Sequence, residues 1–122
     1  MEIFILKEKI QPKQRPRFFR GVVYTPSETT KSENHIKKAY LQQCRNVFFE
    51  AIELDVKIYV GIKDKKRWGE YCQARPDLDN ILKTICDGLN GVAYKDDGQI
   101  SHIKATKIYA PFDYNIIKIK KI

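Results

Sequence analysis

Four aspartates and one lysine with catalytic potential stand close together in the second half of the sequence. Asp77 and Asp79 open a segment with helical spacing, and Lys83 follows four residues after Asp79. The pair Asp96 and Asp97 comes after that segment. Carboxylate oxygens are hard ligands that suit Mg²⁺, and a nearby ammonium group can stabilise negative charge on a phosphate. These residues predict metal-dependent hydrolysis of a polyanion.

Each half of this acidic cluster also has an ordinary structural explanation. An Asp-x-Asp at a helix start commonly caps the helix and forms surface ion pairs. Asp96 and Asp97 before Gly98 are typical of a tight turn. The two halves together favour chemistry, because a helix of about a dozen residues with a returning strand brings the turn back toward the helix start. Asp87 lies four residues after Lys83, so both share the exposed helical face.

Other chemistries find little support in the sequence. An EF-hand loop would need an oxygen ligand, a glycine and an acid where Ile81, Leu82 and Gly88 stand. The sequence contains no Walker phosphate loop. His35 and His102 lack the partner pattern of a nucleophilic triad, and the three scattered cysteines favour neither a disulfide framework nor a zinc site. We therefore expect no small-molecule cofactor.

The composition predicts one basic domain. The chain has 122 residues, 43% hydrophobic content and a formal net charge of +8, so we expect a single domain over residues 1–122 with an anionic partner. A nucleic acid and an acidic membrane face both fit that charge. The sequence has no apolar stretch near the ~20 residues of a membrane span, and unpaired cysteines fit the cytoplasm. We expect a soluble protein of the cytoplasm.

The N-terminal region predicts two extended segments. Residues 2–10 are rich in strand-forming residues, and residues 3–6 among them are apolar on both faces, as in a strand inside a sheet. Residues 11–17 break that strand. Residues 18–24, with Gly21 among them, predict a strand or hairpin before a turn at Thr25-Pro26.

A helix, a strand and a loop are expected next. Residues 54–60 alternate between apolar and polar types, as in a half-buried strand that ends near Gly61. Residues 63–69 lack periodicity and are the best candidate for a mobile loop. The helix before them has one apolar stripe with spacings of three and four: Ile36, Tyr40, Cys44, Val47, Phe48 and Ala51.

The C-terminal half predicts a second helix followed by two strands. Asp77 or Asp79 caps this helix, and Asn90-Gly91 ends it in a left-handed conformation. Residues 100–109 and 115–121 are expected to be strands. Together these elements predict an α+β fold with a mixed sheet and two main helices.

The acidic cluster belongs to a longer pattern. It runs Pro12-Lys13, Arg15-Pro16-Arg17, Gly21, Tyr24-Thr25-Pro26, Arg75-Pro76-Asp77-x-Asp79-Asn80-x-x-Lys83, Asp87-x-Leu89-Asn90-Gly91 and Asp96-Asp97-x-Gln99. This order resembles the RusA family of Holliday-junction resolvases over nearly the whole chain. Two departures from the family are modest: Tyr94 stands where an aromatic residue, often Trp, is usual, and the segment after Pro26 lacks the common Lys-x-x-x-Tyr arrangement. We expect both to affect the substrate surface more than the chemistry. The resemblance also implies a bacterial protein, encoded by a host or a prophage.

The resemblance implies a role for each acidic residue. Asp77, Asp79 and Asp97 match the metal-binding catalytic carboxylates of the family, and Lys83 matches its important lysine. Asp96 would support the metal site or share a ligand role. The resemblance implies a RusA-like homodimer that uses Mg²⁺, with Mn²⁺ as a substitute. Its implied activity is the resolution of four-way DNA junctions in recombination and repair, by paired symmetric nicks that leave 5′-phosphate and 3′-hydroxyl ends.

Two basic segments are candidates for holding DNA. Pro16 stiffens the chain between two arginines, which limits the entropy lost when both meet phosphates. The second segment joins the cations of residues 63–67 to the stacking surfaces of Trp68 and Tyr71, although a charged loop with one aromatic residue is also commonly just a solvated loop whose ring packs down. The candidate DNA-binding residues are Arg15, Arg17, Arg20, Lys65, Lys66, Arg67 and Arg75.

Two alternative functions remain compatible with these residues. One is a nuclease for other branched DNA, such as forks and flaps. The other is a non-catalytic basic DNA-binding module whose acids only cap a helix and form a turn.

Overall fold

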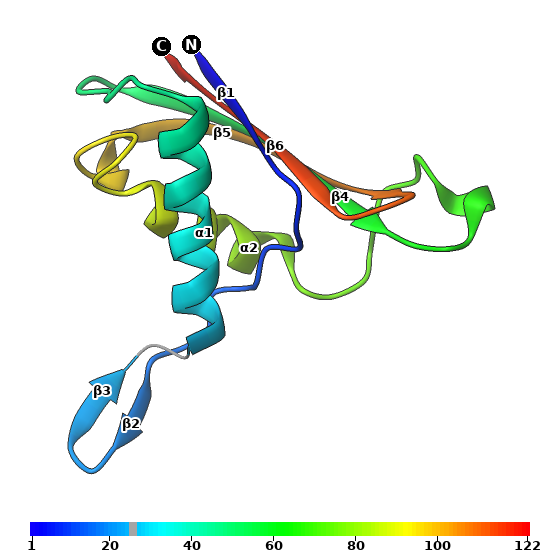
Figure 1. The fold of residues 1–122 in the computed structure, drawn as a ribbon, viewed down its shortest axis with the longest axis horizontal. Helices are drawn as coiled ribbons and strands as arrows, with labels where there is room; N and C mark the ends of the chain where they lie inside the picture. Colours follow the sequence, from blue (N-terminus) through cyan, green and yellow to red (C-terminus); the bar gives the residue numbers. More distant parts are fainter. Residues whose placement is uncertain (25–26) are drawn as a thin grey trace.

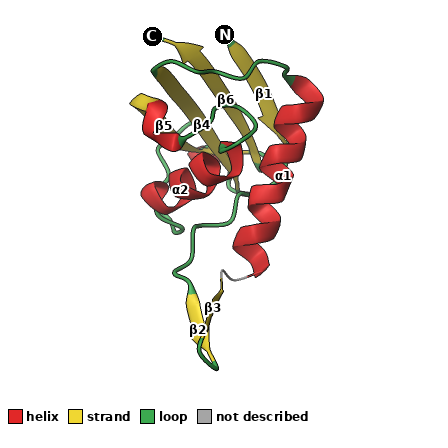
Figure 2. Cartoon of the chain, turned by 90° about the vertical axis from the view of Figure 1, so that its left-hand side faces the viewer, coloured by secondary structure: helices red, strands yellow, loops and turns green. Residues whose placement is uncertain are grey.

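One four-stranded sheet with two helices on the same face forms the body of the protein (Figures 1 and 2). The computed structural model describes residues 1–24 and 27–122, without the side chains of Arg17 and Tyr24. The turn expected at Thr25-Pro26 lies outside the described residues. The prediction of an α+β fold with a mixed sheet and two helices is confirmed.

The sheet has the strand order β1-β6-β4-β5. Its strands are β1 (Glu2–Leu6), β4 (Ile52–Gly61), β5 (Ile100–Ala110) and β6 (Tyr114–Lys121). β4 and β5 are parallel, whereas the other neighbours are antiparallel. In the central strand β4, Leu54 and Val56 are fully buried beneath the helices, while Lys57 is exposed on the other face. The predicted half-buried strand and its end at Gly61 are therefore confirmed.

The expectation that the first strand lies inside the sheet is wrong. β1 is an edge strand that pairs only with β6 in this sheet and ends at Leu6. Phe4 and Leu6 pack into the core, but Ile3 and Ile5 are exposed on the face that no helix covers. The apolar residues on both faces of β1 therefore reflect an uncovered sheet face.

Helix α1 is shorter than the helix that the apolar stripe predicted. It spans Ser27–Gln43, so Val47, Phe48 and Ala51 lie beyond its end. The chain after α1 is irregular, and the backbone N–H of Phe48 donates to the carbonyl of Ala93 at 2.7 Å. The first members of the stripe, Ile36, Tyr40 and Cys44, are buried as expected, since they meet the sheet or the second helix.

Helix α2 (Leu78–Leu89) crosses α1 at close range. A Cβ atom on Gly88 would lie 3.0 Å from Cβ of Ile36, so the helices approach where a side chain is missing. Lys37 of α1 reaches the end of α2, where its Nζ donates to the carbonyls of Asp87 at 3.2 Å and Gly88 at 2.9 Å. Asp77 occupies the N-cap position and Gly91 has φ 87°, so both predicted ends of this helix are confirmed, although the Asp77 side chain makes no capping hydrogen bond.

Smaller elements lie around this body. Strands β2 (Arg17–Phe19) and β3 (Val22–Tyr24) form a separate hairpin, as predicted for residues 18–24. Two short 3-10 helices, η1 (Lys65–Arg67) and η2 (Asp97–Gln99), were not expected. η1 lies within residues 63–69, whose mobility stays a prediction. Among the described residues, no helix is long and apolar enough to cross a membrane.

The contact between Lys37 and the end of α2 predicts a stability effect. Lys37→Met keeps an unbranched side chain but removes a charged donor from the last carbonyls of α2. We expect the free energy of unfolding, measured by urea denaturation, to fall by about 1–2 kcal/mol. Lys38→Met, on the exposed side of the same helix, is the control and should change it by less than about 0.5 kcal/mol. An equal loss in both variants would rule out a specific cap.

Candidate functional site

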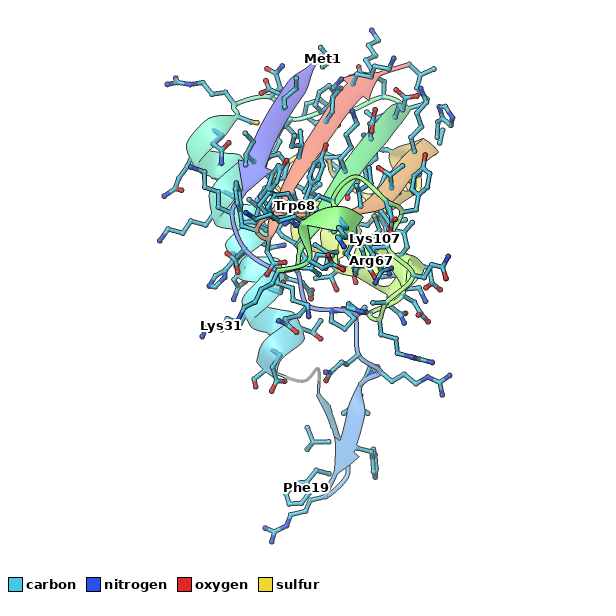
Figure 3. All side chains as sticks on the ribbon, turned by 90° about the vertical axis from the view of Figure 1, so that its right-hand side faces the viewer. Met1, Phe19, Lys31, Arg67, Trp68 and Lys107 are labelled. Atoms are coloured by element: carbon cyan, nitrogen blue, oxygen red, sulfur yellow. The ribbon has the colours of Figure 1, made fainter. Side chains whose placement is uncertain are left out.

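The loop before α2 is held by a lysine that the sequence did not single out. Nζ of Lys107, on β5, donates to the carbonyl of Pro76 at 2.8 Å and to the carbonyl of Ala74. Figure 3 labels Lys107 beside the segment that leads to α2. These bonds tie the chain just before Asp77 to the sheet. A strand lysine in an alternating pattern gives no signal of this role in the sequence.

The segment that carries Arg15 is fixed between the two helices. Thr29 of α1 accepts the backbone N–H of Gln14 at 3.3 Å and donates to the carbonyl of Pro12 at 3.1 Å. The backbone N–H of Lys13 donates to the carbonyl of Asn80 in α2 at 2.9 Å. The segment therefore runs alongside the first turn of α2, although it is far from that helix in the sequence.

A cleft of about 600 Å³ lies between this segment and α2. Three predicted residues, Arg15, Lys83 and Asp97, meet there from the N-terminal segment, from α2 and from η2. The full lining is Lys13, Gln14, Arg15, Pro16, Asn80, Lys83, Asp87 and Asp97. Since acidic and cationic side chains share one open cleft, it can accept a phosphate beside carboxylate oxygens.

Asp77 lies in an adjoining hollow rather than in the cleft itself. This hollow has a volume of about 420 Å³ and is also lined by Arg75, while Asn80 lines both spaces. Oδ1 of Asp79, at the start of α2, accepts the backbone N–H of Asn80 at 3.0 Å. Within the described part of the chain, no three His, Cys, Asp or Glu side chains are grouped closely enough to hold a metal ion.

Lys13 and Asp87 form an ion pair in the cleft. The sequence alone predicted no site role for either residue. Nζ of Lys13 lies 2.9 Å from Oδ2 of Asp87 and 3.4 Å from Oε1 of Glu33. Burial acts to lower the pKa of Lys13, but these two carboxylates raise it on balance. Lys13 thus stays protonated in the cleft. Its place beside Pro12 in the family pattern was the signal available in the sequence.

Asp96 has a structural role as the cap of η2. Its Oδ2 accepts the backbone N–H of Gly98 at 3.2 Å, and Oε1 of Gln99 accepts the backbone N–H of Asp96 at 3.1 Å. Nε2 of Gln99 also donates to the carbonyls of Phe48 and Glu50, at 2.9 and 3.1 Å. The capping box fixes the turn that presents Asp97 to the cleft. A ligand role for Asp96 stays a prediction.

Tyr94 lies beneath this turn and is fully buried. Its hydroxyl donates to the carbonyl of Cys86 at 2.6 Å. The expectation that Tyr94 affects the substrate surface is therefore wrong, because its ring belongs to the core. Burial, and then the charges of Asp87 and Asp97, raise the pKa of the neighbouring Cys86 thiol to about 11.

The structure separates the two basic segments. Arg20 lies in the turn of the hairpin next to the cleft, whereas Lys65, Lys66 and Arg67 form η1 at the other end of the molecule (Figure 1). Nε of Arg67 is 3.2 Å from Oε2 of Glu70, and its guanidinium lies over the Tyr109 ring. The side chain of Arg17 is outside the described residues.

Trp68 shows how the η1 segment packs. Its indole N–H donates to the carbonyl of Ile62 at 2.9 Å, and the residue as a whole is 37% exposed. Figure 3 shows Trp68 and Arg67 on the same loop. The indole is therefore partly committed to holding this loop, as the alternative of a solvated loop with a packed ring suggested.

A basic α+β domain whose cleft joins aspartates to lysines and an arginine has the features of the nuclease class. The sequence agrees with that class, because residues 9–120 match the family model described as Endodeoxyribonuclease RusA. The chain belongs to the RusA family.

Two curated proteins show the same similarity. The chain is 40% identical to the Crossover junction endodeoxyribonuclease rusA of Lactococcus phage r1t, over 47% of this chain and 44% of the relative. It is 31% identical to the Uncharacterized protein YqaN of Bacillus subtilis (strain 168), over 48% of this chain and 49% of the relative. The chain spans about half the length of the curated relatives it matches.

The capping box at η2 predicts different outcomes for two substitutions of Asp96. Asp96→Ala removes the capping oxygen and should lower the free energy of unfolding by about 1 kcal/mol in thermal denaturation. Asp96→Ser keeps an oxygen that can accept the same backbone N–H and should recover most of that loss. Full stability together with weakened Mg²⁺ binding in Asp96→Ser would instead give Asp96 the ligand role.

Proposed function

We propose that this protein is a Mg²⁺-dependent endodeoxyribonuclease that resolves four-way DNA junctions by paired symmetric nicks. The observation that carries the proposal is the cleft in which Asp97 and Asp87 lie with Lys83, Lys13 and Arg15. Family membership supports the same reading, as does the phage relative named a crossover junction endodeoxyribonuclease. The DNA substrate, the nicking reaction and a bacterial cytoplasmic location are all parts of this proposal.

Asp77, Asp79 and Asp97 are the proposed metal ligands. Their carboxylates offer the hard oxygen donors that Mg²⁺ requires, and Mn²⁺ accepts the same donors. A bound ion would lower the pKa of its water and offset negative charge that develops on the phosphate. The proposal rests on donor chemistry and on the family pattern. It requires the carboxylates to draw together around the ion, because Asp77 and Asp97 line adjoining spaces and no three acids are grouped in the described part of the chain.

Lys83 is the proposed partner of the scissile phosphate. It lies on the exposed face of α2 and lines the same cleft as Asp97. An ammonium group there can offset charge on the phosphate, or hold the attacking water in line with it. Lys13 and Arg15 line the opposite side of the cleft, where they can hold the flanking phosphates.

We further propose that the active form is a homodimer. A four-way junction has approximate two-fold symmetry, so two identical subunits related by a two-fold axis can present one active site to each of two matching strands. Paired nicks then follow from the symmetry of the assembly.

Two other functions are alternatives for the same cleft. A nuclease for forks or flaps needs the same chemistry but no paired active sites. A non-catalytic DNA-binding module does not require an acid such as Asp97 beside Lys83 in one cleft. Cleavage of junction, fork, flap and linear duplex, compared with Mg²⁺ and with EDTA, separates all three.

The metal site predicts the result of single Asp→Asn substitutions at 77, 79 and 97. Asparagine keeps the size of the side chain but removes an anionic ligand, so several kcal/mol of transition-state stabilisation should be lost. Junction cleavage under single-turnover conditions should fall by about a hundredfold or more. Junction affinity should persist or rise, because repulsion between the carboxylates and the phosphates decreases.

Asp113→Asn is a matched control, since Asp113 lies on the β5–β6 turn and its Oδ1 accepts the backbone N–H of Gly61. It removes a carboxylate charge without touching the cleft, and cleavage should be unchanged. Wild-type cleavage rates in all three test variants would sink the ligand assignment.

Junction recognition predicts how binding responds to salt. Each phosphate neutralised releases counterions, which gives a logarithmic slope of about −0.9 per contact with duplex DNA. Attraction from net charge is screened first, whereas a dimer that holds several arms keeps its contacts. We therefore expect the preference for a four-way junction over linear duplex to survive near physiological salt. If linear duplex displaces the junction at equal phosphate concentration, the resolvase proposal fails.

A further inference from the structure

The β2–β3 hairpin projects from the body of the protein and carries exposed apolar side chains. Figures 1 and 2 show it extending beyond the end of α1, and Figure 3 shows Phe19 near its free end. Phe18 and Phe19 are 74% and 61% exposed, and Val22 and Val23 are 62% and 64% exposed. Four large apolar residues on so short a hairpin are therefore open to a partner.

Both faces of the hairpin are apolar. Phe18 is paired with Val23 and Phe19 with Val22, and consecutive strand residues point to opposite faces. Each face thus presents one phenylalanine with one valine. A two-stranded hairpin is marginally stable in water, and a surface hairpin normally buries one face. Because these apolar side chains are exposed on both faces, they do not stabilise the fold.

The tip of the hairpin is narrow and basic. Arg20 and Gly21 have φ 50° and 78°, as in the two-residue type I′ turn that suits twisted strands. The guanidinium of Arg20 lies 5.3 Å from the centre of the Phe19 ring. An aromatic ring and a cation are therefore presented together at the free end.

The positive charge of the segment that carries the hairpin indicates the chemistry of its partner. Residues 12–27 contain Lys13, Arg15, Arg17 and Arg20 but no aspartate or glutamate. Arg15 and Pro16 line the cleft, and β2 begins at the next residue, so the hairpin continues directly from the wall of the cleft. A polyanion held in the cleft would extend along the hairpin. This continuity favours nucleic acid over an apolar protein surface.

We propose that the β2–β3 hairpin is a wedge that inserts between base pairs at the branch point of bound DNA, with Phe18 and Phe19 as the stacking side chains. The inference rests on the proposed function, because it requires branched DNA in the cleft. A two-stranded ribbon fits a DNA groove, and apolar side chains can separate base steps. Insertion costs least where stacking is already interrupted, which is the case at a branch point.

The test uses the full-length protein and four-way junctions that carry 2-aminopurine either beside the branch point or within an arm. EDTA is present, so that binding is read without cleavage. We expect the wild-type protein to raise the fluorescence of the base beside the branch point, because insertion unstacks it, and to leave the base in the arm unchanged. Phe18→Ala/Phe19→Ala should abolish the rise and weaken junction binding by about fivefold to 100-fold.

Two further variants make the test specific. Phe18→Tyr/Phe19→Tyr keeps both rings and should keep the fluorescence rise. Phe112→Ala removes another exposed phenylalanine, on the β5–β6 turn, and should behave as wild type. All substituted side chains are exposed, and circular dichroism verifies that each variant folds.

Each outcome bears on one proposal. An equal rise at the branch point and in the arm, no rise with the wild-type protein, or an unchanged rise in Phe18→Ala/Phe19→Ala overturns the wedge. Cleavage with Mg²⁺ is scored separately on the same junctions. Cleavage without a fluorescence rise leaves the nuclease proposal standing and removes the wedge, whereas a rise without cleavage supports the wedge and removes the nuclease.

Discussion

The close contact between α1 and α2 at Gly88 is the constraint on which the cleft depends. A Cβ atom there would lie 3.0 Å from Ile36 Cβ and 3.2 Å from the carbonyl oxygen of Glu33, so any larger residue would push the helices apart. Lys37 secures the C-terminal end of α2, and the backbone of Lys13 secures its first turn through Asn80. Because α2 is fixed at both ends, Lys83 and Asp87 have a defined position relative to Arg15 and Asp97.

The protein has a net charge of +8, and the carboxylates in its cleft lie beside basic side chains. Lys13 lies between Asp87 and Glu33, which places a cation next to acids that would otherwise repel a phosphate. A similar arrangement occurs on the uncovered sheet face, where the Glu53 carboxylate lies 2.6 Å from His102 and 3.1 Å from Lys120. The hydrogen bond from Lys120 is the largest influence that lowers the pKa of Glu53. In both places the carboxylates lie close to basic side chains.

The basic residues fall into two groups with different settings. Those of residues 12–20 adjoin the cleft and the hairpin, on the path of the proposed DNA substrate. Those of η1 lie at the other end of the molecule, and Arg67 is already engaged by Glu70 and Tyr109. A long substrate with several arms could meet both groups, whereas the cleft requires only the first. The separation of the two groups is compatible with the proposed preference for branched DNA.

The sequence by itself determined the elements that rest on local chemistry. The period of β4, the start of α2 after Asp77, the left-handed Gly91 and the Arg20-Gly21 hairpin all follow from short-range preferences, and the acidic pattern identified the family. Tertiary structure alone decided the rest. The strand order makes β1 an edge strand. Phe48 lies beyond the end of α1, where its backbone N–H bonds to the carbonyl of Ala93 instead of to a helical carbonyl. Lys107 on the Pro76 carbonyl and Lys13 beside Asp87 join residues 31 and 74 positions apart. Such contacts depend on which distant segments meet, and no local preference of a single residue encodes that.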